Sequence, residues 1–289
     1  MKYTNPSSPE FWEALAKAKE CDDINKKCLK PETWDKAAAT YDDLEKCKDY
    51  QDQINTILNI LQQKGVLDKK NIVIDVACGT GTYAVKMAPY VKEVVALDIS
   101  KGMLGELRKK IERYSLKNIK IINEDWMNFS SENKFDLVFC SMTPLLRSAH
   151  TIKKFIKISS RYIGIVTWAG VRKNMLLNEV SKKIFGKPFE QKGQDITFIF
   201  NYLYSLGFAP NLTFFTGCWE RIRKADEQIR NLIWRLEMKR SLSQEEKDIV
   251  EKIVYEHQDK DGYVRAITTV RTCFMFIDKK QAKESFDCF

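Results

Sequence analysis

A buried strand that leads into a glycine-rich turn limits the folds open to this chain more than any other part of its sequence. Residues 71–76 are apolar apart from Asn71 and Asp75, which is typical of a strand buried on both faces. The apolar positions 85, 87 and 88 indicate a helix beyond the turn. A strand, a tight glycine turn and a helix in this order predict the nucleotide-binding corner of an α/β sheet.

Two kinds of ligand fit this corner. The spacing Gly79-x-Gly81-x-x-Ala84, with Asp98 about twenty residues after the first glycine, satisfies the dinucleotide fingerprint. Asp75 argues against a dinucleotide, because a carboxylate there would repel a pyrophosphate but could hold an ammonium group. The pattern Asp75-x-Ala77-x-Gly79-x-Gly81 resembles the first motif of class I S-adenosylmethionine-dependent methyltransferases, with alanine at the first of three usual glycines.

Three later segments resemble the next strands of that family, and the resemblance implies their roles. Residues 93–98 end in Asp98, which would bind both ribose hydroxyls, while Ile99 would pack on the adenine. Residues 119–123 precede Asp125, which would lie near the adenine amine, and Trp126, which would lie beside the base. Residues 135–142 look like the fourth strand, and its end at Met142 would lie under the methionine part of the cofactor.

A simpler interpretation exists for each of these residues. Asp75, Asp98 and Asp125 could be ordinary strand-end acids that shape turns, and Trp126 could be a core aromatic. Three acids at the ends of three consecutive strands favour binding, because the carboxyl ends of parallel strands form the ligand-binding edge of such a sheet.

A segment before the first strand extends the resemblance. Residues 34–42 resemble the entry segment of small-molecule methyltransferases, in which aromatic side chains close over the cofactor. The resemblance implies that Trp34 and Tyr41 contact the cofactor and that Tyr41 reaches its carboxylate. The alternative is that both aromatics only pack on a covering helix.

The chain is predicted to be one methyltransferase domain over residues 1–289. We expect an α/β fold with a Rossmann-like, seven-stranded, mostly parallel sheet, helices on both faces and an antiparallel last strand. Residues 1–65 would form an N-terminal helical cap, 66–223 the cofactor-binding core, 224–262 an inserted helical lid and 263–289 the final strand and tail.

The inserted lid contains two predicted helices. Residues 243–246 form a capping box that begins the second one. The apolar stripes at Ile229, Ile233, Ile249 and Ile253 are expected to meet Trp34 and Tyr41 above the cofactor, so that cap and lid together build an acceptor pocket.

His150 is the candidate general base. It follows the fourth strand and begins a predicted helix, whose N-terminus disfavours the imidazolium form and keeps the ring able to accept a proton. A surface histidine is the alternative, and methyl transfer by in-line displacement can proceed without a side-chain base. His257 closes the second inserted helix, where a structural role is favoured.

Composition restricts the partners. The net charge is +9, but the lysines are dispersed, and the fourth strand ends in Ser141-Met142-Thr143-Pro144 instead of the Asn/Asp-Pro-Pro-aromatic motif of many methyltransferases of base amino groups. Nucleic acid is therefore an unlikely partner. No signal peptide and no membrane span are evident, so a cytoplasmic location is expected. No metal site is predicted, although Cys21, Cys28 and Cys47 leave that question and redox chemistry open.

The sequence therefore predicts a methyltransferase that converts S-adenosyl-L-methionine to S-adenosyl-L-homocysteine while methylating a small molecule. The acceptor atom and the oligomeric state stay open. A tRNA or rRNA methyltransferase, a nicotinamide-dependent oxidoreductase and a non-catalytic cofactor-binding protein are the alternatives.

Overall fold

One seven-stranded sheet organises the protein. The structure is a computed structural model that describes residues 5–20, 29–189 and 196–284. The strands follow the order β3-β2-β1-β4-β5-β7-β6, and β7 runs antiparallel to both of its neighbours. Their bounds are β1 Ile72–Val76, β2 Glu93–Asp98, β3 Ile119–Asn123, β4 Phe135–Ser141, β5 Ser159–Asn174, β6 Asn211–Lys224 and β7 Tyr263–Asp278. The predicted sheet, with its antiparallel last strand, is confirmed.

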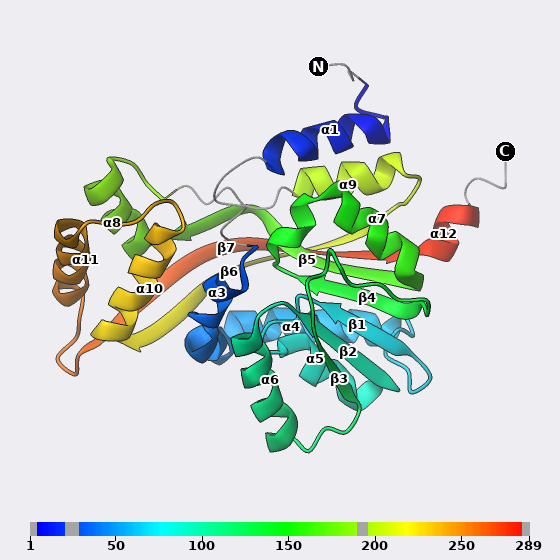
Figure 1. Cartoon of the computed structure of the whole chain (residues 1–289), viewed down its shortest axis with the longest axis horizontal. Coiled ribbons are helices and arrows are strands. Elements are labelled where there is room, and N and C mark those ends of the chain that lie inside the picture. Colours follow the sequence, from blue (N-terminus) through cyan, green and yellow to red (C-terminus); the bar gives the residue numbers. More distant parts are fainter. Residues whose placement is uncertain (1–4, 21–28, 190–195, 285–289) are drawn as a thin grey trace.

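Helices cover both faces of this sheet (Figure 1). One face carries α4 Lys48–Gln63, α5 Thr82–Met87 and α6 Lys101–Arg113, and the other carries α1 Pro9–Glu20, α7 Ala149–Ile158 and α9 Ile196–Ser205. Each layer encloses its own apolar core, because strands buried on both faces present side chains to both sides. α4 packs on the sheet through Ile54, Ile57 and Leu61, which are fully buried. None of the helices in the described ranges is long and apolar enough to cross a bilayer.

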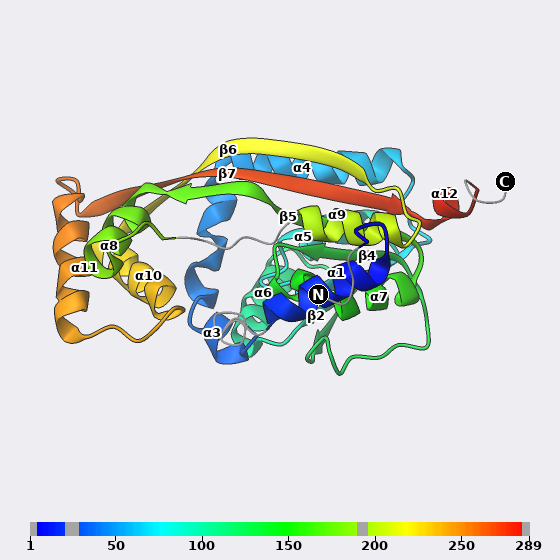
Figure 2. The same cartoon turned by 90° about the horizontal axis from the view of Figure 1, so that it is seen from above.

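The strands β5, β6 and β7 continue past this core to a separate group of helices (Figures 1 and 2). We call α8 Met175–Phe185, α10 Ala225–Glu237 and α11 Gln244–Glu256 the outer helices. The sequence predicted α10, α11 and the capping box between Ser243 and Glu246, and the structure has all three. It did not predict α8, which shares a third apolar core with α10 and α11.

The apolar stripes of α10 and α11 were expected to meet Trp34 and Tyr41, and the structure corrects this expectation. Ile229 and Ile253 are buried within the core of the outer helices, with Ile233 packed against it, and Ile249 is 36% exposed. The stripes therefore do not meet Trp34 and Tyr41, because they pack with α8 in this separate apolar core. The opposite face of α10 approaches the N-terminal segment instead: the Trp34 and Trp234 rings lie 6.4 Å apart, and Trp234 Nε1 donates to Thr33 O at 3.0 Å.

The short elements α3 Pro31–Asp35 and η1 Ala38–Lys46 form what we call the cap segment, residues 29–46. In both views it lies between the outer helices and the rest of the molecule. Asp35 Oδ1 accepts hydrogen bonds from Ser100 Oγ at 2.6 Å and from Gly102 N at 2.8 Å. Asp42 accepts one from Thr80 Oγ1 at 2.5 Å. The cap segment is thus attached to the β2–α6 connection and to the glycine turn. The remaining short elements are η2 Ala88–Tyr90, η3 Pro144–Arg147 and α12 Lys279–Glu284.

Candidate active site

The turn after β1 holds its backbone in left-handed conformations. Ala77, Gly79 and Gly81 have φ angles of 54°, 57° and 81°. The two glycines serve different purposes. A Cβ on Gly81 would lie 2.3 Å from Leu107 Cδ1, so this glycine allows α6 to pack on the turn. A Cβ on Gly79 would meet only Tyr41 Cε1, at 3.8 Å, so Gly79 leaves an opening between the turn and the cap segment.

The predicted acids lie around one cavity, which we call the acid-lined cavity. Its volume is about 370 Å³, and its walls include Asp98, Ile99, Asp125 and Trp126. Asp98 accepts hydrogen bonds from Gly79 N and Ser100 N, both at 2.8 Å, and its burial raises the pKa of the carboxyl. Asp125 Oδ1 accepts from Met127 N at 2.9 Å, which shapes the turn after β3. The neighbouring strands β1, β2 and β3 thus bring these residues together.

Trp126 has most of its surface in the core. Its ring is stacked on Phe129 at 5.9 Å and meets Phe155 edge-on at 5.2 Å, and the side chain is only 2% exposed. Lys154 Nζ lies 4.4 Å from the ring centroid. The same residue still forms part of the cavity wall. Both interpretations given above for Trp126 therefore agree with its position.

Asp75 lies at the carboxyl end of β1 and faces a second cavity, of about 280 Å³. It is 2% exposed, and burial raises the pKa of its carboxyl to about 8, although a backbone hydrogen bond from Ala84 opposes the shift. At neutral pH this acid is thus largely protonated unless a cation approaches it.

The two cavities meet at the cap segment and at the end of β4. Trp34, Tyr41, Ala77, Gly79 and Met142 line both of them. Met142 has a φ of 51° and donates its backbone N–H to Val166 O at 2.8 Å. A non-glycine residue held in this region at a ligand-facing position is a typical feature of functional sites.

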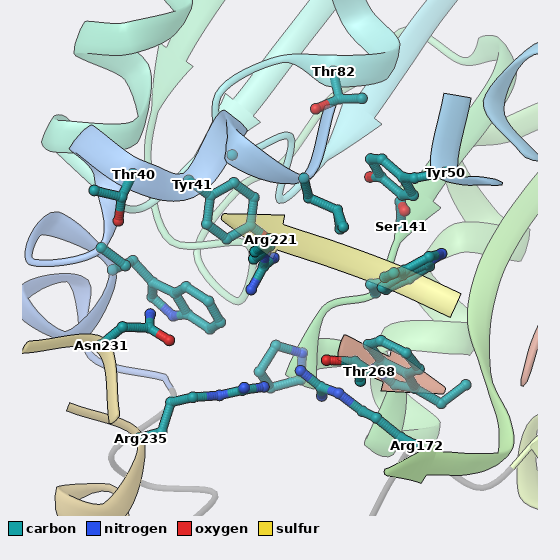
Figure 3. Close-up of a pocket in the computed structure, with 18 of the residues that line it drawn as sticks. Thr40, Tyr41, Tyr50, Thr82, Ser141, Arg172, Arg221, Asn231, Arg235 and Thr268 are labelled. Atoms are coloured by element: carbon teal, nitrogen blue, oxygen red, sulfur yellow. The ribbon is translucent and has the colours of Figure 1, made fainter. Parts of the chain in front are cut away.

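We call the second cavity the arginine cavity. Arg172 of β5, Arg221 of β6 and Arg235 of α10 line it, and Figure 3 shows Arg172 and Arg235 extending into it from opposite sides. The aromatic side chains of its wall are Trp34, Tyr41, Tyr50, Tyr83, Trp168, Phe189, Trp219 and Trp234. The sequence interpretation missed the three arginines. One signal was available, because Trp219, Arg221 and Arg223 alternate along β6 and therefore share one face of the strand.

The structure does not bring the histidines into either cavity. His150 is the second residue of α7, is exposed and lies outside both walls, because the helix begins after η3 has turned the chain away from the end of β4. His257 follows α11, and its Nε2 lies 2.9 Å from Glu179 Oε2 of α8, which supports a structural role.

No metal centre is evident in the part of the chain that the structure describes, where no three His, Cys, Asp or Glu side chains are placed to share an ion. Cys21 and Cys28 lie outside the described residues. Cys47 is buried, and its thiol lies 3.7 Å from the carbonyl oxygen of Cys218.

Comparisons with known proteins agree with this architecture. Residues 73–163 match the family model of a methyltransferase domain. An uncharacterized protein of Haemophilus influenzae is 28% identical over 207 residues, which cover 66% of this chain and 70% of that protein. Demethylmenaquinone methyltransferase of Bacillus cereus is 30% identical over 116 residues, which cover 36% of this chain and 49% of the enzyme. This chain thus spans about half the length of that relative.

A solved structure is also similar to this chain. Magnesium protoporphyrin IX methyltransferase of Synechocystis, with bound S-adenosylhomocysteine, matches with a TM-score of 0.47 and 22% identity over 58% of this chain and 77% of that one. The sheet order, the glycine turn and the match of residues 73–163 identify a methyltransferase domain in this chain. Methyltransferases of this family use S-adenosylmethionine as their cofactor.

Proposed function

We propose that this protein transfers the methyl group of S-adenosylmethionine to a small-molecule acceptor bound in the arginine cavity. The observation that carries this proposal is the shared wall of the two cavities. A cofactor that fills the acid-lined cavity presents its other end to the arginine cavity, where an acceptor can lie in line with the sulfur and the methyl group.

The acid-lined cavity suits the adenosine half of the cofactor. Asp98 would accept the ribose hydroxyls, since each carboxylate oxygen can accept a bond besides the one from the backbone. Ile99, Trp126 and Asp125 would surround the adenine. These positions, like those below, are proposals that rest on the shape and chemistry of the cavity.

The shared wall suits the methionine half. Asp75 would pair with the ammonium group, and Tyr41 with Trp34 would cover this part from the cap segment. Gly79 leaves room for the ligand beside the turn, and Ala77 and Met142 form the surface at the ends of β1 and β4. Gly81 contributes by allowing the turn to pack on α6.

Positioning and exclusion of water would supply most of the rate enhancement. When bound, the cofactor supplies an electrophilic methyl group on a sulfonium, which leaves as a neutral thioether. The aromatic wall of the arginine cavity removes water from the acceptor, and the contact between Trp34 and Trp234 closes the site on the side of the outer helices. His150 lies outside both cavity walls, so this proposal assigns it no step.

A labelling experiment tests this function. The purified protein is incubated with S-adenosylmethionine carrying a trideuteromethyl group and with a cell extract separated into a small-molecule fraction and an RNA fraction. We expect the label in a small molecule, together with S-adenosylhomocysteine, and no labelling by an Asp98→Ala variant. Label in RNA would contradict the choice of acceptor, and failure to bind either form of the cofactor would contradict the proposal as a whole.

A further inference from the structure

Three arginines of the arginine cavity have no acidic partner among the residues that the structure describes. Among the described residues, no carboxylate lies within ion-pair distance of Arg172, Arg221 or Arg235, and the Nε atoms of Arg172 and Arg221 are buried without a hydrogen-bond partner. The next arginine on the same face of β6 shows the usual arrangement. Arg223 Nε donates to Asp43 Oδ2 at 2.9 Å, and its Nη2 donates to Thr40 O at 3.2 Å. Within the described part of the chain, Arg223 is therefore paired with a carboxylate, whereas Arg172, Arg221 and Arg235 face the cavity without one.

These guanidinium groups are close enough to weaken one another's charge. Burial, followed by repulsion from Arg221, lowers the pKa of Arg172 to about 9. Burial also lowers the pKa values of Arg221 and Arg235, and neighbouring arginines lower both further. Gathering like charges in an enclosed space without counter-charges costs free energy. An anion that enters the cavity would remove this cost, so the site favours an anionic ligand.

The walls of the cavity favour a flat ligand body. Arg172 lies 4.0 Å from the ring centroid of Trp168, and Trp168 packs on Trp219 with the ring centroids 5.3 Å apart. Tyr50 continues the aromatic surface, 5.1 Å from Trp219. A guanidinium stacked on an indole keeps its edge N–H groups free for an oxyanion. Aromatic faces beside these donors suit a planar molecule that carries its charge at the rim.

The cofactor alone does not account for this charge. S-adenosylmethionine brings one carboxylate, but it also brings a sulfonium and an ammonium group, so it adds positive charge to the site. Among the described residues that line the cavity, the acids are the buried Asp75 and the half-buried Glu45, and Glu45 is paired with Lys110. One carboxylate can satisfy one of the three arginines bidentately. The other two remain for a second molecule.

We propose that the acceptor is a planar aromatic acid, whose carboxylate or phosphate groups are held by Arg172, Arg221 and Arg235 and whose ring lies against the Trp168–Trp219 wall. That this acid accepts the methyl group rests on the function proposed above. That the arginine cavity binds it is a separate claim, which can be tested without turnover.

Calorimetric titration with three related probes tests this inference. Benzene-1,3-dicarboxylate and phenyl phosphate carry the proposed charges, and benzene-1,3-dicarboxamide is a neutral molecule of the same shape as the first. Each probe is titrated into the protein with and without saturating S-adenosylhomocysteine. We expect at least one anionic probe to bind about 10-fold or more tightly than the diamide, the scale of a charged hydrogen bond. Which anion binds better distinguishes a carboxylate from a phosphate ligand.

Two variants connect the binding to the arginines. Arg172→Gln and Arg235→Gln keep hydrogen-bonding capacity but remove the positive charge. Each variant should bind the anionic probe about 10-fold more weakly than the natural protein does. Arg113→Gln makes the same charge change at the exposed end of α6, and it should bind the probe like the natural protein.

Three results would overturn the inference. These are equal binding of the diamide and the anions, equal binding by Arg172→Gln and Arg113→Gln, and a loss of S-adenosylhomocysteine affinity in the arginine variants that matches the loss of probe affinity. The last result would assign the arginines to the cofactor carboxylate. A protein that binds the anion but never the cofactor would instead contradict the proposed function and leave the anion site standing.

Discussion

The acid-lined cavity and the arginine cavity differ in how the chain builds them. The acids and the glycine turn come from β1, β2 and β3 and from the loops that follow them, all within residues 72–126. The arginines come from β5, β6 and α10, and the cap segment adds its aromatics from the other end of the chain. The proposed cofactor pocket thus depends on local backbone geometry, whereas the proposed acceptor pocket depends on how distant segments come together.

The two cavities also differ in charge. The walls of the first include the acids Asp98, Glu124 and Asp125, and those of the second include Arg172, Arg221 and Arg235. This difference supports the proposal of one ligand for each cavity. Variants should therefore separate into those that affect the cofactor and those that affect the acceptor, and the following changes are ordered by the size of the effect we expect.

The largest effect should follow Gly79→Val. The branched side chain would occupy the opening between the glycine turn and Tyr41 and should weaken cofactor binding about 100-fold or more, which is about 2.7 kcal/mol. Gly65→Val is the matched control, because Gly65 has a φ of 69° and open space around its Cβ position, far from both cavities. It shares the backbone strain and should bind the cofactor normally in a calorimetric titration. A similar loss in both variants would mean that strain, and not occupied space, prevents binding.

Asp98→Ala should weaken cofactor binding by about 1.5 to 3 kcal/mol, because two hydroxyls would lose a charged acceptor. The change also leaves Gly79 N without its partner, so the free energy of unfolding should fall by about 1–3 kcal/mol. Asp136→Ala separates the two effects. Asp136 Oδ2 accepts from Ile72 N at 2.8 Å, so its loss should destabilise the protein similarly and leave binding unchanged. Unaltered affinity in folded Asp98→Ala would remove Asp98 from the ribose site.

Asp75 predicts a pH dependence of cofactor binding. Its folded pKa of about 8 lies above the usual value, so the free protein holds this proton below pH 8, and pairing with an ammonium group must release it. Affinity for S-adenosylhomocysteine should therefore rise about 50-fold from pH 6 to pH 8, as the deprotonated fraction of Asp75 grows, and then level off. Calorimetry in buffers of different ionisation enthalpy measures the released proton directly. Asp75→Asn should abolish the release, and an unchanged pH profile in that variant would assign the proton to another group.

The smallest effect should follow Trp234→Ala. The indole joins α10 to the cap segment through Trp34 and through the carbonyl of Thr33. In the natural protein, S-adenosylhomocysteine should increase hydrogen-exchange protection in residues 30–45 and in α10 together. In the variant, protection should stay in residues 30–45 and disappear from α10, with cofactor affinity changed about threefold or less. Tyr204→Ala removes an exposed aromatic of α9 and should change neither. Protection confined to the glycine turn in the natural protein would contradict the coupling.

The same contrast explains what the sequence could predict. Asp75, Gly79 and Asp98 are recognisable because parallel strands place their carboxyl ends at one edge, so spacing along the chain fixes neighbours in space. The long strands β6 and β7 were predictable from their β-branched and aromatic residues. The extension of these strands beyond the core was not predictable, because the residue pattern of a strand does not indicate which helices pack against its end.

Most of the residues around the arginine cavity could not be predicted from the sequence pattern. The stripes of α10 and α11 correctly predicted buried faces but not their partner, since Ile229 and Ile253 lie in an apolar core that α8 shares. The pocket-facing residues of the same helix, Trp234 and Arg235, lie between stripe positions and resemble an ordinary solvated face in sequence. His150 was expected near the site from its place after β4, but the turn η3 intervenes.

A crystal structure of the protein with S-adenosylhomocysteine bound tests the assignment of the two cavities most directly. The account predicts that the ribose hydroxyls lie within hydrogen-bond distance of Asp98, that the adenine lies beside Ile99 and Asp125, and that the sulfur faces the arginine cavity near Met142. Adenosine bound among Arg172, Arg221 and Arg235, or a sulfur that faces away from them, would contradict it.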